Sequence, residues 1–414
     1  MRRLLLLCLI SVPAIWADDG FYLKAGDRVV FYGDSITDQR LYTTFTETFV
    51  LTRFPTLDVS FTHSGWGGDR VGGGGGGPID QRLERDVFPY KPTVVTIMLG
   101  MNDGGYRAFD QSLFDTYSTG FQHIVASLKE HLPGVRITTI LPSPYDDVTR
   151  DPMFAGGYNG TLWRYSLWLR DFAKKENLQE ADLNTPVVAA LKKAKDIDAA
   201  NAAKLLPDRV HPAPAGHLLM AEALLRAWNV PAVVSAVTIN GRSGKAAGTK
   251  NASVSNVKTK GGLSWDATEE ALPMALDPKD RLLKLALEAS DFVEALDRED
   301  LRVTGLKPGR YTLSIDGATI GSYDAAALEA GINLATLDTP MSRQALDVHA
   351  LTLQHTLVHN TRWRTIQVPM AKDSYESKEK VMSDLDQLDR EIIARQRQAA
   401  QPKPHHFELN AANQ

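Results

Sequence analysis

The chain has 414 residues, of which 43% are hydrophobic and 23% are charged, so it has an ordinary globular composition and enough length for more than one domain. Its formal net charge of −4 provides no basic field for a polyanion, and nucleic acid is therefore excluded as an expected partner. Its single cysteine excludes a disulfide framework, so we expect burial of a hydrophobic core to stabilise the fold.

Residues 1–17, MRRLLLLCLISVPAIWA, are typical of a secretory signal peptide. Arg2 and Arg3 precede a short apolar run that ends in small residues, and this run is too short to span a membrane. We expect cleavage near residue 17, export to the periplasm or the extracellular space, and no stable membrane anchor. Cys8 lies within this segment, so the mature protein is expected to carry no thiol.

The apolar run VVFY is followed by Gly33, Asp34 and Ser35, which predicts a buried strand that ends in a tight turn and presents a serine. A serine hydroxyl is a poor nucleophile at neutral pH. It needs a base for its proton, a group that orients the base, and donors for the oxyanion that forms. Downstream, Asp208 and His211 lie three residues apart in LPDRVHPAPAGH, a spacing that lets a carboxylate and an imidazole on one loop face the same serine.

The chain alternates between predicted strands and helices as far as residue 230. We expect a helix over 43–53, an alternating strand over 57–62, and a strand over 93–99 whose unbroken apolar run suits a parallel strand covered on both faces. This alternation predicts a three-layer α/β/α sandwich with a parallel sheet, and in such sheets the site lies outside the carboxyl ends of the strands. The remaining predicted elements are helices over 78–90, 110–132, 158–175 and 215–228 and a strand over 137–141.

Four short blocks, GDS, GGD, GMND and DRVH, occur in this order, and each is weak alone. Together they make residues 22–230 resemble the SGNH hydrolases, the GDSL-type esterases and lipases. The resemblance implies Ser35 as nucleophile, His211 as general base and acid, and Asp208 as the group that orients the histidine. It also implies an oxyanion hole formed by the backbone N–H groups of Ser35 and Gly68 and by the side-chain amide of Asn102.

Four other residues, in these blocks or just before the second one, are expected on the substrate side of the site. They are Asp34, His63, Trp66 and Asp103. His63 is a departure from the family pattern, because it stands where many members have an asparagine. We expect it to alter the wall of the pocket and to leave the mechanism intact.

Six consecutive glycines occupy residues 72–77, close to Gly68 in the sequence. We interpret them as a mobile or closely approaching loop on the substrate side, in preference to a slack connector. A phosphate cradle is disfavoured, because no Lys-Ser/Thr pair follows to begin a nucleotide-binding helix.

A metal site formed by Asp208, His211 and His217 is the main chemical alternative. It lacks a compact ligand motif such as two histidines one helical turn apart, and it leaves Ser35 and Asn102 without a role. We therefore expect no metal and no cofactor, and we interpret His217 as a packed or solvent-facing histidine of a helix.

Residues 231–338 are expected to form an accessory β-rich region that caps the catalytic domain or adds a layer to it. A strand is predicted over 233–239, and the alternating segment 301–317 predicts a β-hairpin. A carbohydrate-binding module would need exposed aromatic side chains, and Trp265 with Tyr311 is thin support for one.

Residues 339–400 are expected to be helical, starting at a Thr339 cap and a first-turn proline. His355 and His359 are one turn apart, but no third ligand is apparent, so we interpret them as part of a solvated face. The tail, 401–414, is expected to be disordered.

These observations favour a secreted serine esterase that works through an acyl-enzyme. The absence of a long apolar lid helix near the motifs, together with export, favours a carbohydrate O-acetyl esterase acting on substrates such as acetylated polysaccharide. A lipase or thioesterase of the same mechanism remains an alternative. A catalytically inactive glycan-binding scaffold is disfavoured, because decay usually removes a catalytic or oxyanion residue and all of them are present.

Overall fold

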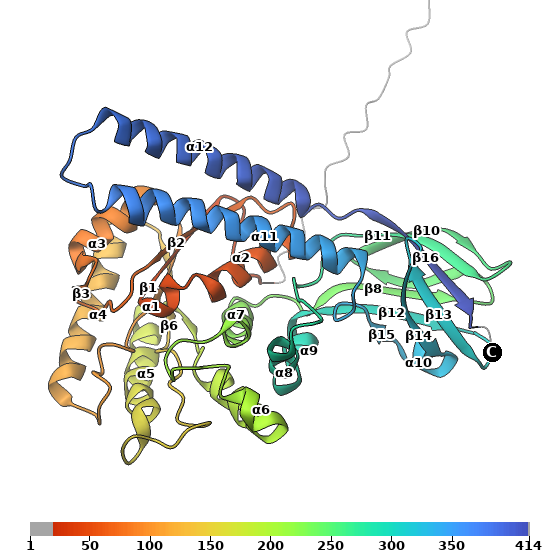
Figure 1. The fold of residues 1–414 in the computed structure, drawn as a ribbon, viewed down its shortest axis with the longest axis horizontal. Coiled ribbons are helices and arrows are strands. Elements are labelled where there is room, and N and C mark those ends of the chain that lie inside the picture. Colours follow the sequence, from red (N-terminus) through yellow and green to blue (C-terminus); the bar gives the residue numbers. More distant parts are fainter. Residues whose placement is uncertain (1–19, 413–414) are drawn as a thin grey trace, which may run out of the picture.

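The computed structural model describes residues 20–412, so the predicted signal peptide at 1–17, including Cys8, lies outside the described residues. The chain first forms a parallel α/β unit and then a mainly antiparallel β-sandwich beside it (Figure 1). Two long helices then run back across the α/β unit, and the final strand returns to the sandwich. None of the helices within 20–412 combines the length and apolar character needed to cross a membrane.

The central sheet has five parallel strands in the order β2-β1-β5-β6-β7. Along β1, Val29 and Phe31 face one core cluster while Val30 and Tyr32 face the other, so both faces of the sheet are covered. The predicted parallel three-layer α/β fold is therefore confirmed. The strands are β1 (Asp27–Gly33), β2 (Val59–Gly65), β5 (Val94–Met98), β6 (Arg136–Ile140) and β7 (Gln179–Ala181).

Helices α2, α6 and α7 cover one face of this sheet, and α3, α4 and most of α5 cover the other (Figure 1). Helix α4 illustrates how the sequence sets an element: the Asp110 side chain caps it by accepting N–H groups at Ser112 and Leu113. The helices of this unit are α1 (Ser35–Asp38), α2 (Leu41–Arg53), α3 (Ile79–Asp86), α4 (Gln111–His131), α5 (Gly157–Glu176), α6 (Thr185–Ala202) and α7 (Pro214–Ala227), with a 3-10 turn η1 (Phe88–Tyr90).

The strand order places the predicted motifs at one edge of the sheet. The chain passes from β1 to β2 on one side and then crosses to β5 on the other side of β1. At such a switch point the loops that follow the strands diverge and leave a crevice. The loops after Gly33, Gly65 and Met98 therefore meet at this crevice, and they carry the three motifs.

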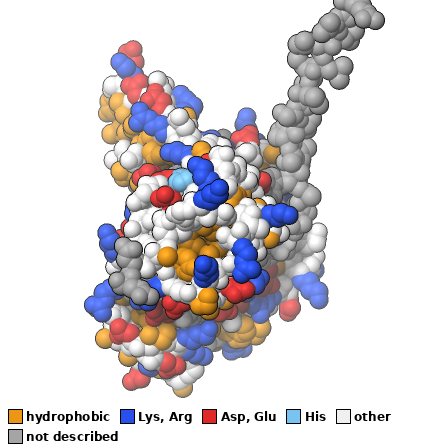
Figure 2. Space-filling view, turned by 90° about the vertical axis from the view of Figure 1, so that its right-hand side faces the viewer, with side chains coloured by type: hydrophobic (Ala, Val, Ile, Leu, Met, Phe, Trp, Pro, Cys, Tyr) orange, Lys and Arg blue, Asp and Glu red, His pale blue; other side chains and the backbone are white. Residues whose placement is uncertain are grey.

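Residues 233–333 and the last strand form two sheets that pack face to face, with orders β10-β11-β16-β13-β14 and β15-β12-β8-β9. Trp265 is fully buried between them and stacks on Phe407, so it is no ligand platform. Seen from this end, charged side chains of both signs surround a group of hydrophobic side chains (Figure 2). The strands are β8 (Val233–Asn240), β9 (Lys245–Lys250), β10 (Ala252–Lys258), β11 (Leu263–Glu269), β12 (Arg298–Thr304), β13 (Arg310–Ile315), β14 (Ala318–Asp324), β15 (Ile332–Asn333) and β16 (Pro404–Ala411).

Three short helices belong to the same part of the chain. Helices α8 and α9 contribute Leu283, Leu285 and Phe292 to the core of the α/β unit, so they join the sandwich to it. Helix α10 contributes Leu328 to the core of the sandwich. The bounds are α8 (Arg281–Ala289), α9 (Phe292–Leu296) and α10 (Ala325–Ala330).

Two predictions for this region are wrong. The segment 301–317 contains two strands, but β12 and β13 lie in different sheets and do not form a hairpin, because β13 pairs with β14 and β16. The expectation of a disordered tail is wrong for residues 404–411, because they form β16, which lies between β11 and β13. Phe407 and Leu409 of β16 enter the sandwich core. These two apolar residues alternate with polar ones, and the polar composition of the tail hides this strand pattern in the sequence.

The C-terminal helices α11 (Pro340–Asn360) and α12 (Glu376–Ala399) are joined through a π-helical turn, η2 (Thr361–Gln367). The Thr339 cap and first-turn proline are present as expected. Helix α11 lies along α2 and β2, and α12 lies against α11 (Figure 1). Nearly every side chain of α2 is buried as a result, including its threonines and Glu47.

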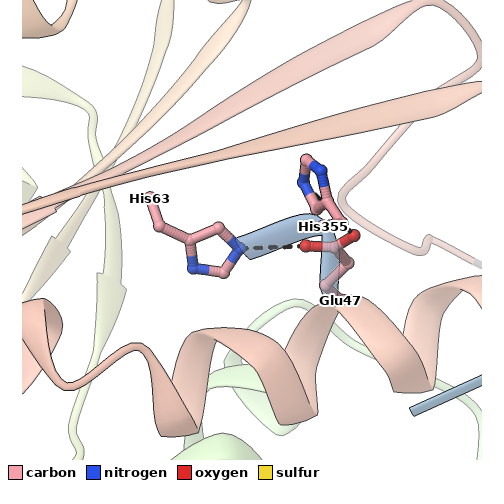
Figure 3. Close-up of side chains that lie close together, drawn as sticks. All are labelled: Glu47, His63 and His355. Atoms are coloured by element: carbon pink, nitrogen blue, oxygen red, sulfur yellow. Dashed lines mark hydrogen bonds and ion pairs between the residues drawn. The ribbon is translucent and has the colours of Figure 1, made fainter. Parts of the chain in front are cut away.

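The contact between α2, β2 and α11 is formed by buried polar side chains (Figure 3). Glu47 lies at its centre, 2.9 Å from His63 Nε2, and it accepts a hydrogen bond of 3.0 Å from Gln396. His355 Nε2 lies 3.9 Å from the same carboxylate, while its Nδ1 lies 2.6 Å from Asp389. We call this group of five residues the α2–α11 seam.

The interpretation of His355 and His359 as part of a solvated face is wrong, because both side chains are buried. Burial alone would lower the pKa of His355, but the carboxylates of Glu47 and Asp389 outweigh it and raise the pKa to about 9. His355 is therefore an imidazolium held between two acids at neutral pH.

We predict that the α2–α11 seam makes stability depend on pH. The unfolded pKa of a histidine is about 6.5, so the contribution of His355 is complete below that value and is lost as the pH rises towards about 9. Urea unfolding should show a loss on the order of 3 kcal/mol across this window in the wild type, and a much smaller loss in His355→Gln.

His349→Gln is the matched control, since it also removes a polar contact between α11 and α2, but burial lowers the pKa of His349 to about 4, outside the window. Equal losses of unfolding free energy in the wild type and His355→Gln would contradict the charged assignment.

Candidate active site

Ser35 is the first residue of α1, and only Asp34 separates it from the end of the strand β1. The Asp34 side chain caps this helix by accepting the N–H of Ile36 at 3.0 Å. Gly33 is required at the turn, because a Cβ there would lie 2.7 Å from the carbonyl oxygen of Met98. The half-buried Ser35 is therefore fixed at the end of a tight strand-to-helix turn, as expected.

The structure brings Ser35, His211 and Asp208 into one hydrogen-bond chain. His211 Nε2 lies 2.8 Å from Ser35 Oγ, and His211 Nδ1 lies 2.7 Å from Asp208 Oδ2. Asp208 Oδ1 accepts the backbone N–H groups of His211 at 2.7 Å and Val210 at 3.0 Å. Partial burial would raise the pKa of Asp208, but these hydrogen bonds lower it below its usual value, so the carboxylate is ionised at neutral pH.

Arg209 anchors the loop that carries this pair. Its backbone has a φ of +75°, in the left-handed region that few side chains adopt. Its guanidinium donates to the carbonyl oxygens of Asp151 at 2.9 Å and Asp146 at 3.3 Å, and its own carbonyl accepts the N–H of Asp146 at 2.9 Å. These bonds fix the position of His211 relative to the sheet.

The predicted oxyanion donors lie on the loops after β2 and β5, on either side of Ser35. Gly68 has a φ of +79°, and no acceptor for its N–H is found within residues 20–412. Asn102 donates one amide hydrogen to the carbonyl oxygen of Asp69 at 3.0 Å. Its second amide hydrogen is therefore left for another acceptor.

Tyr106 is a site residue that the sequence did not indicate. Its hydroxyl donates to Asn102 Oδ1 at 2.9 Å and so fixes which way the amide points. The tyrosine ring is tilted against the ring of Tyr158, with centroids 5.0 Å apart. Only its spacing of four residues from Asn102 could have suggested the contact.

Two of the four expected substrate-side residues are buried beneath the loops. Burial raises the pKa of Asp34 to about 7 and that of Asp103 to about 6. Asp34 caps α1, and Asp103 accepts the N–H of Val71 at 3.0 Å. Both side chains therefore shape the loops around Ser35 and do not face a substrate.

The other two candidates, His63 and Trp66, lie in different surroundings. His63 is buried in the α2–α11 seam, so the expectation that it forms the wall of the pocket is wrong. Trp66 is half-buried, and its indole is covered by the guanidinium of Arg364, which lies 3.3 Å above the ring centroid. Trp66 therefore supports an arginine of the pocket.

A fully buried guanidinium, Arg82, connects the loops behind the site. It donates to Asp69 Oδ2 and to the carbonyl oxygen of Ser64, both at 2.8 Å, and it pairs with Asp86. Trp363 Nε1 donates to the same Asp86 at 2.5 Å. The C-terminal region is thereby joined to the charge cluster that holds the oxyanion loop.

The glycine run packs tightly against this cluster. Gly73–Gly74 and Gly77–Pro78 pair as the short strands β3 and β4. A Cβ on Gly76 would lie 2.6 Å from atoms of both Trp66 and Arg82. The run is therefore a closely approaching loop and no slack connector.

A cavity of about 330 Å³ opens beside Ser35, and its lining is polar. Two of its residues, Asn360 and Arg364, come from the end of α11 and from η2, far from the motifs in sequence. No motif marks these residues, so the contribution of the C-terminal region to the pocket could not be anticipated. The lining consists of Ser35, Asp38, Gln39, Arg40, Asn360 and Arg364.

The alternative metal site is not assembled, because both ring nitrogens of His217 are engaged by groups other than His211 and Asp208. His217 is buried, with Nδ1 accepting the N–H of Tyr42 at 3.2 Å and Nε2 lying 2.9 Å from Gln39 Oε1. Of the two alternatives expected for His217, a packed or a solvent-facing histidine, the structure shows the packed one.

Another trio of side chains, in the part of the chain that the structure describes, has ligand atoms close enough to share an ion. This trio, Glu47, His63 and His355, lies in the α2–α11 seam (Figure 3). Hydrogen bonds and ion pairs with protein groups already engage its side chains, and it does not line the pocket of Ser35.

Comparison with known proteins supports the expected family. Residues 31–219, which span Ser35 to His211, match the model of the GDSL-like lipase/acylhydrolase family. An acetylxylan esterase from Geobacillus stearothermophilus is 26% identical over 226 residues, which are 49% of this chain and 94% of that protein.

One solved structure extends the comparison to nearly the whole chain. A gut microbial diltiazem-metabolizing enzyme is similar over 94% of this chain and 98% of its own, at 27% identity and a TM-score of 0.81. The solved Geobacillus esterase covers 50% of this chain and 96% of its own, at 25% identity and a TM-score of 0.41. The chain thus carries a catalytic domain of the SGNH/GDSL hydrolases, and it is a carboxylic ester hydrolase.

Proposed function

We propose that the protein is an exported serine esterase that removes small acyl groups, acetyl above all, from carbohydrates. The observation that carries the proposal is the hydrogen-bond chain from Asp208 through His211 to Ser35, with links of 2.7 and 2.8 Å. Export rests on the character of residues 1–17 alone.

In this reaction Ser35 Oγ attacks the ester carbonyl carbon while His211 Nε2 takes the hydroxyl proton. The carbon–oxygen bond to the alcohol then breaks, and His211 returns the proton to the leaving alcohol. Water attacks the acyl-enzyme with the same histidine as base, which releases the acid and restores Ser35. Asp208 holds Nδ1–H and stabilises the imidazolium that forms in each half of the reaction.

The negative oxygen of each tetrahedral intermediate needs donors that are already in place. The backbone N–H groups of Ser35 and Gly68 and the remaining amide hydrogen of Asn102 fit this role. Tyr106 is a positioning residue, because it acts on Asn102 and not on the substrate.

The substrate class is supported by the pocket and by one relative. The cavity beside Ser35 is small and lined by polar side chains, which suits a hydroxyl-rich alcohol and a short acyl group better than a long acyl chain. The similarity to an acetylxylan esterase points in the same direction. The similarity over nearly the whole chain to a diltiazem-metabolizing enzyme supports a second candidate, a small ester that is not a carbohydrate.

A fluorophosphonate probe tests the nucleophile. The probe should label the wild-type protein at Ser35, and Ser35→Ala should lose both labelling and ester hydrolysis while keeping its thermal unfolding temperature, because removal of this hydroxyl leaves no large cavity. Ser383→Ala, an exposed serine on α12, is the matched control and should behave as wild type. Labelling of Ser35→Ala at the wild-type rate would refute the assignment.

Esters that differ only in acyl length test the substrate class. We expect kcat/KM for acetylated xylosides to exceed that for the octanoyl esters of the same sugar by at least about tenfold, because the cavity offers no apolar channel. The assay measures the acid released by each ester at matched concentrations. A higher kcat/KM for the octanoyl esters would favour the lipase alternative.

Two substitutions test the oxyanion side of the site. Asn102→Ala should lower kcat by roughly a hundredfold to a thousandfold, the usual loss for one donor. Tyr106→Phe should cause a smaller loss, with KM little changed, because the amide keeps its position but loses the bond that orients it. Tyr375→Phe, an exposed tyrosine, serves as the control. If Asn102→Ala changes kcat by less than about threefold, the amide does not face the oxyanion.

A further inference from the structure

The cavity beside Ser35 contains more positive than negative charge. Arg40 and Arg364 both line it, and Asp38 is the one carboxylate in its lining. One Asp38 oxygen already accepts the N–H of Gly67 at 3.1 Å, and the other lies 3.6 Å from Arg364. The pocket therefore has a surplus cation next to the nucleophile.

Arg40 has an unfavourable backbone conformation, and its guanidinium makes no hydrogen bond in the part of the chain that the structure describes. It immediately precedes α2 with a φ of +58°, in the left-handed region. Its backbone N–H and carbonyl are engaged with Thr37 and Thr44, but no acceptor for its guanidinium is found within residues 20–412. A partly buried guanidinium without an acceptor is costly, and such costs concentrate at binding sites.

The neighbours of Arg364 fix its position but leave hydrogen-bond donors of its guanidinium without close acceptors. Its guanidinium lies 3.3 Å above the ring centroid of Trp66, so stacking fixes its plane. Its polar contacts are long, 3.6 Å to Asp38 and 3.5 Å to the carbonyl oxygen of Gly65. Its neighbour Trp363 is anchored on Asp86, which holds this turn against the site.

A neutral sugar would leave the surplus charge without compensation, whereas a carboxylate would satisfy it. Guanidinium groups bind carboxylates through paired, charge-assisted hydrogen bonds. We infer that Arg40 and Arg364 form an anion subsite that binds a carboxylate of the substrate, so that the preferred substrates are acetyl esters of acidic sugars. The choice of sugar rests on the proposed function, but the anion subsite does not.

Two acetylated sugars that differ only at one carbon test the inference. Methyl glucuronoside and methyl glucoside acetates differ by a carboxylate in place of a hydroxymethyl group. The wild-type kcat/KM should favour the uronate by about tenfold or more at low salt, and the preference should shrink as ionic strength rises.

Arg40→Gln and Arg364→Gln should each lose at least about tenfold more kcat/KM toward the uronate than toward the neutral sugar, mainly through KM. Arg364→Lys should restore part of the preference, because it restores the charge but not the fork of donors. Arg395→Gln, on the exposed side of α12, removes the same charge and should keep the wild-type preference.

Inhibition of 4-nitrophenyl acetate hydrolysis separates this inference from the proposed function. The unacetylated methyl glucuronoside should inhibit competitively at a concentration about tenfold lower than methyl glucoside does. Equal inhibition by the two sugars overturns the anion subsite. Selective inhibition by the uronate without hydrolysis of either acetylated sugar supports the subsite and refutes the carbohydrate esterase.

Discussion

The loops around Ser35 depend on one buried ionic cluster, in which Arg82 lies between Asp69 and Asp86 with no exposure to solvent. Removing such a charge from water costs several kcal/mol, and loss of one partner leaves that cost uncompensated. Asp69 and Asp86 each also accept a second hydrogen bond. The backbone of Asp69 receives the Asn102 amide, and Asp86 receives the Trp363 indole. The oxyanion side of the site and the C-terminal wall of the pocket are thus fixed by the same guanidinium.

The C-terminal helices contact the α/β unit through polar groups more than through an apolar stripe. Helix α2 presents Thr48 to His349 and Thr352 of α11, and it presents Glu47 to Gln396 of α12. Contacts of this kind fix the register of one element on another more sharply than hydrophobic contact does. A fixed register matters for the pocket, because Asn360 and Arg364 of its wall belong to a separate part of the chain.

The sequence was informative where function demands particular residues at strand ends. The turn at Gly33 and Ser35 and the Asp208-His211 pair could be placed because each motif is local and its chemistry is constrained. Contacts between residues far apart in the sequence have no comparable local motif. The strand β16 pairs with a strand far upstream in the sequence. His355 has the sequence pattern of a surface residue, and only its contact with Glu47 of α2 shows that it is buried. Arg364 lies outside the family match that ends at residue 219, so nothing local connected it to Ser35.

The position of the sandwich in the chain order has a genetic consequence. Residues 233–333 lie between the α/β unit and the helices that wall its pocket, while β16 ties the end of those helices back to the sandwich. The pocket beside Ser35 is therefore encoded by two separate segments of the gene. A recombination breakpoint near residue 230 would exchange the sandwich and the pocket wall together and leave Ser35, Asp208 and His211 in place. In this architecture, a single recombination event can change which esters the pocket accepts without altering the catalytic residues.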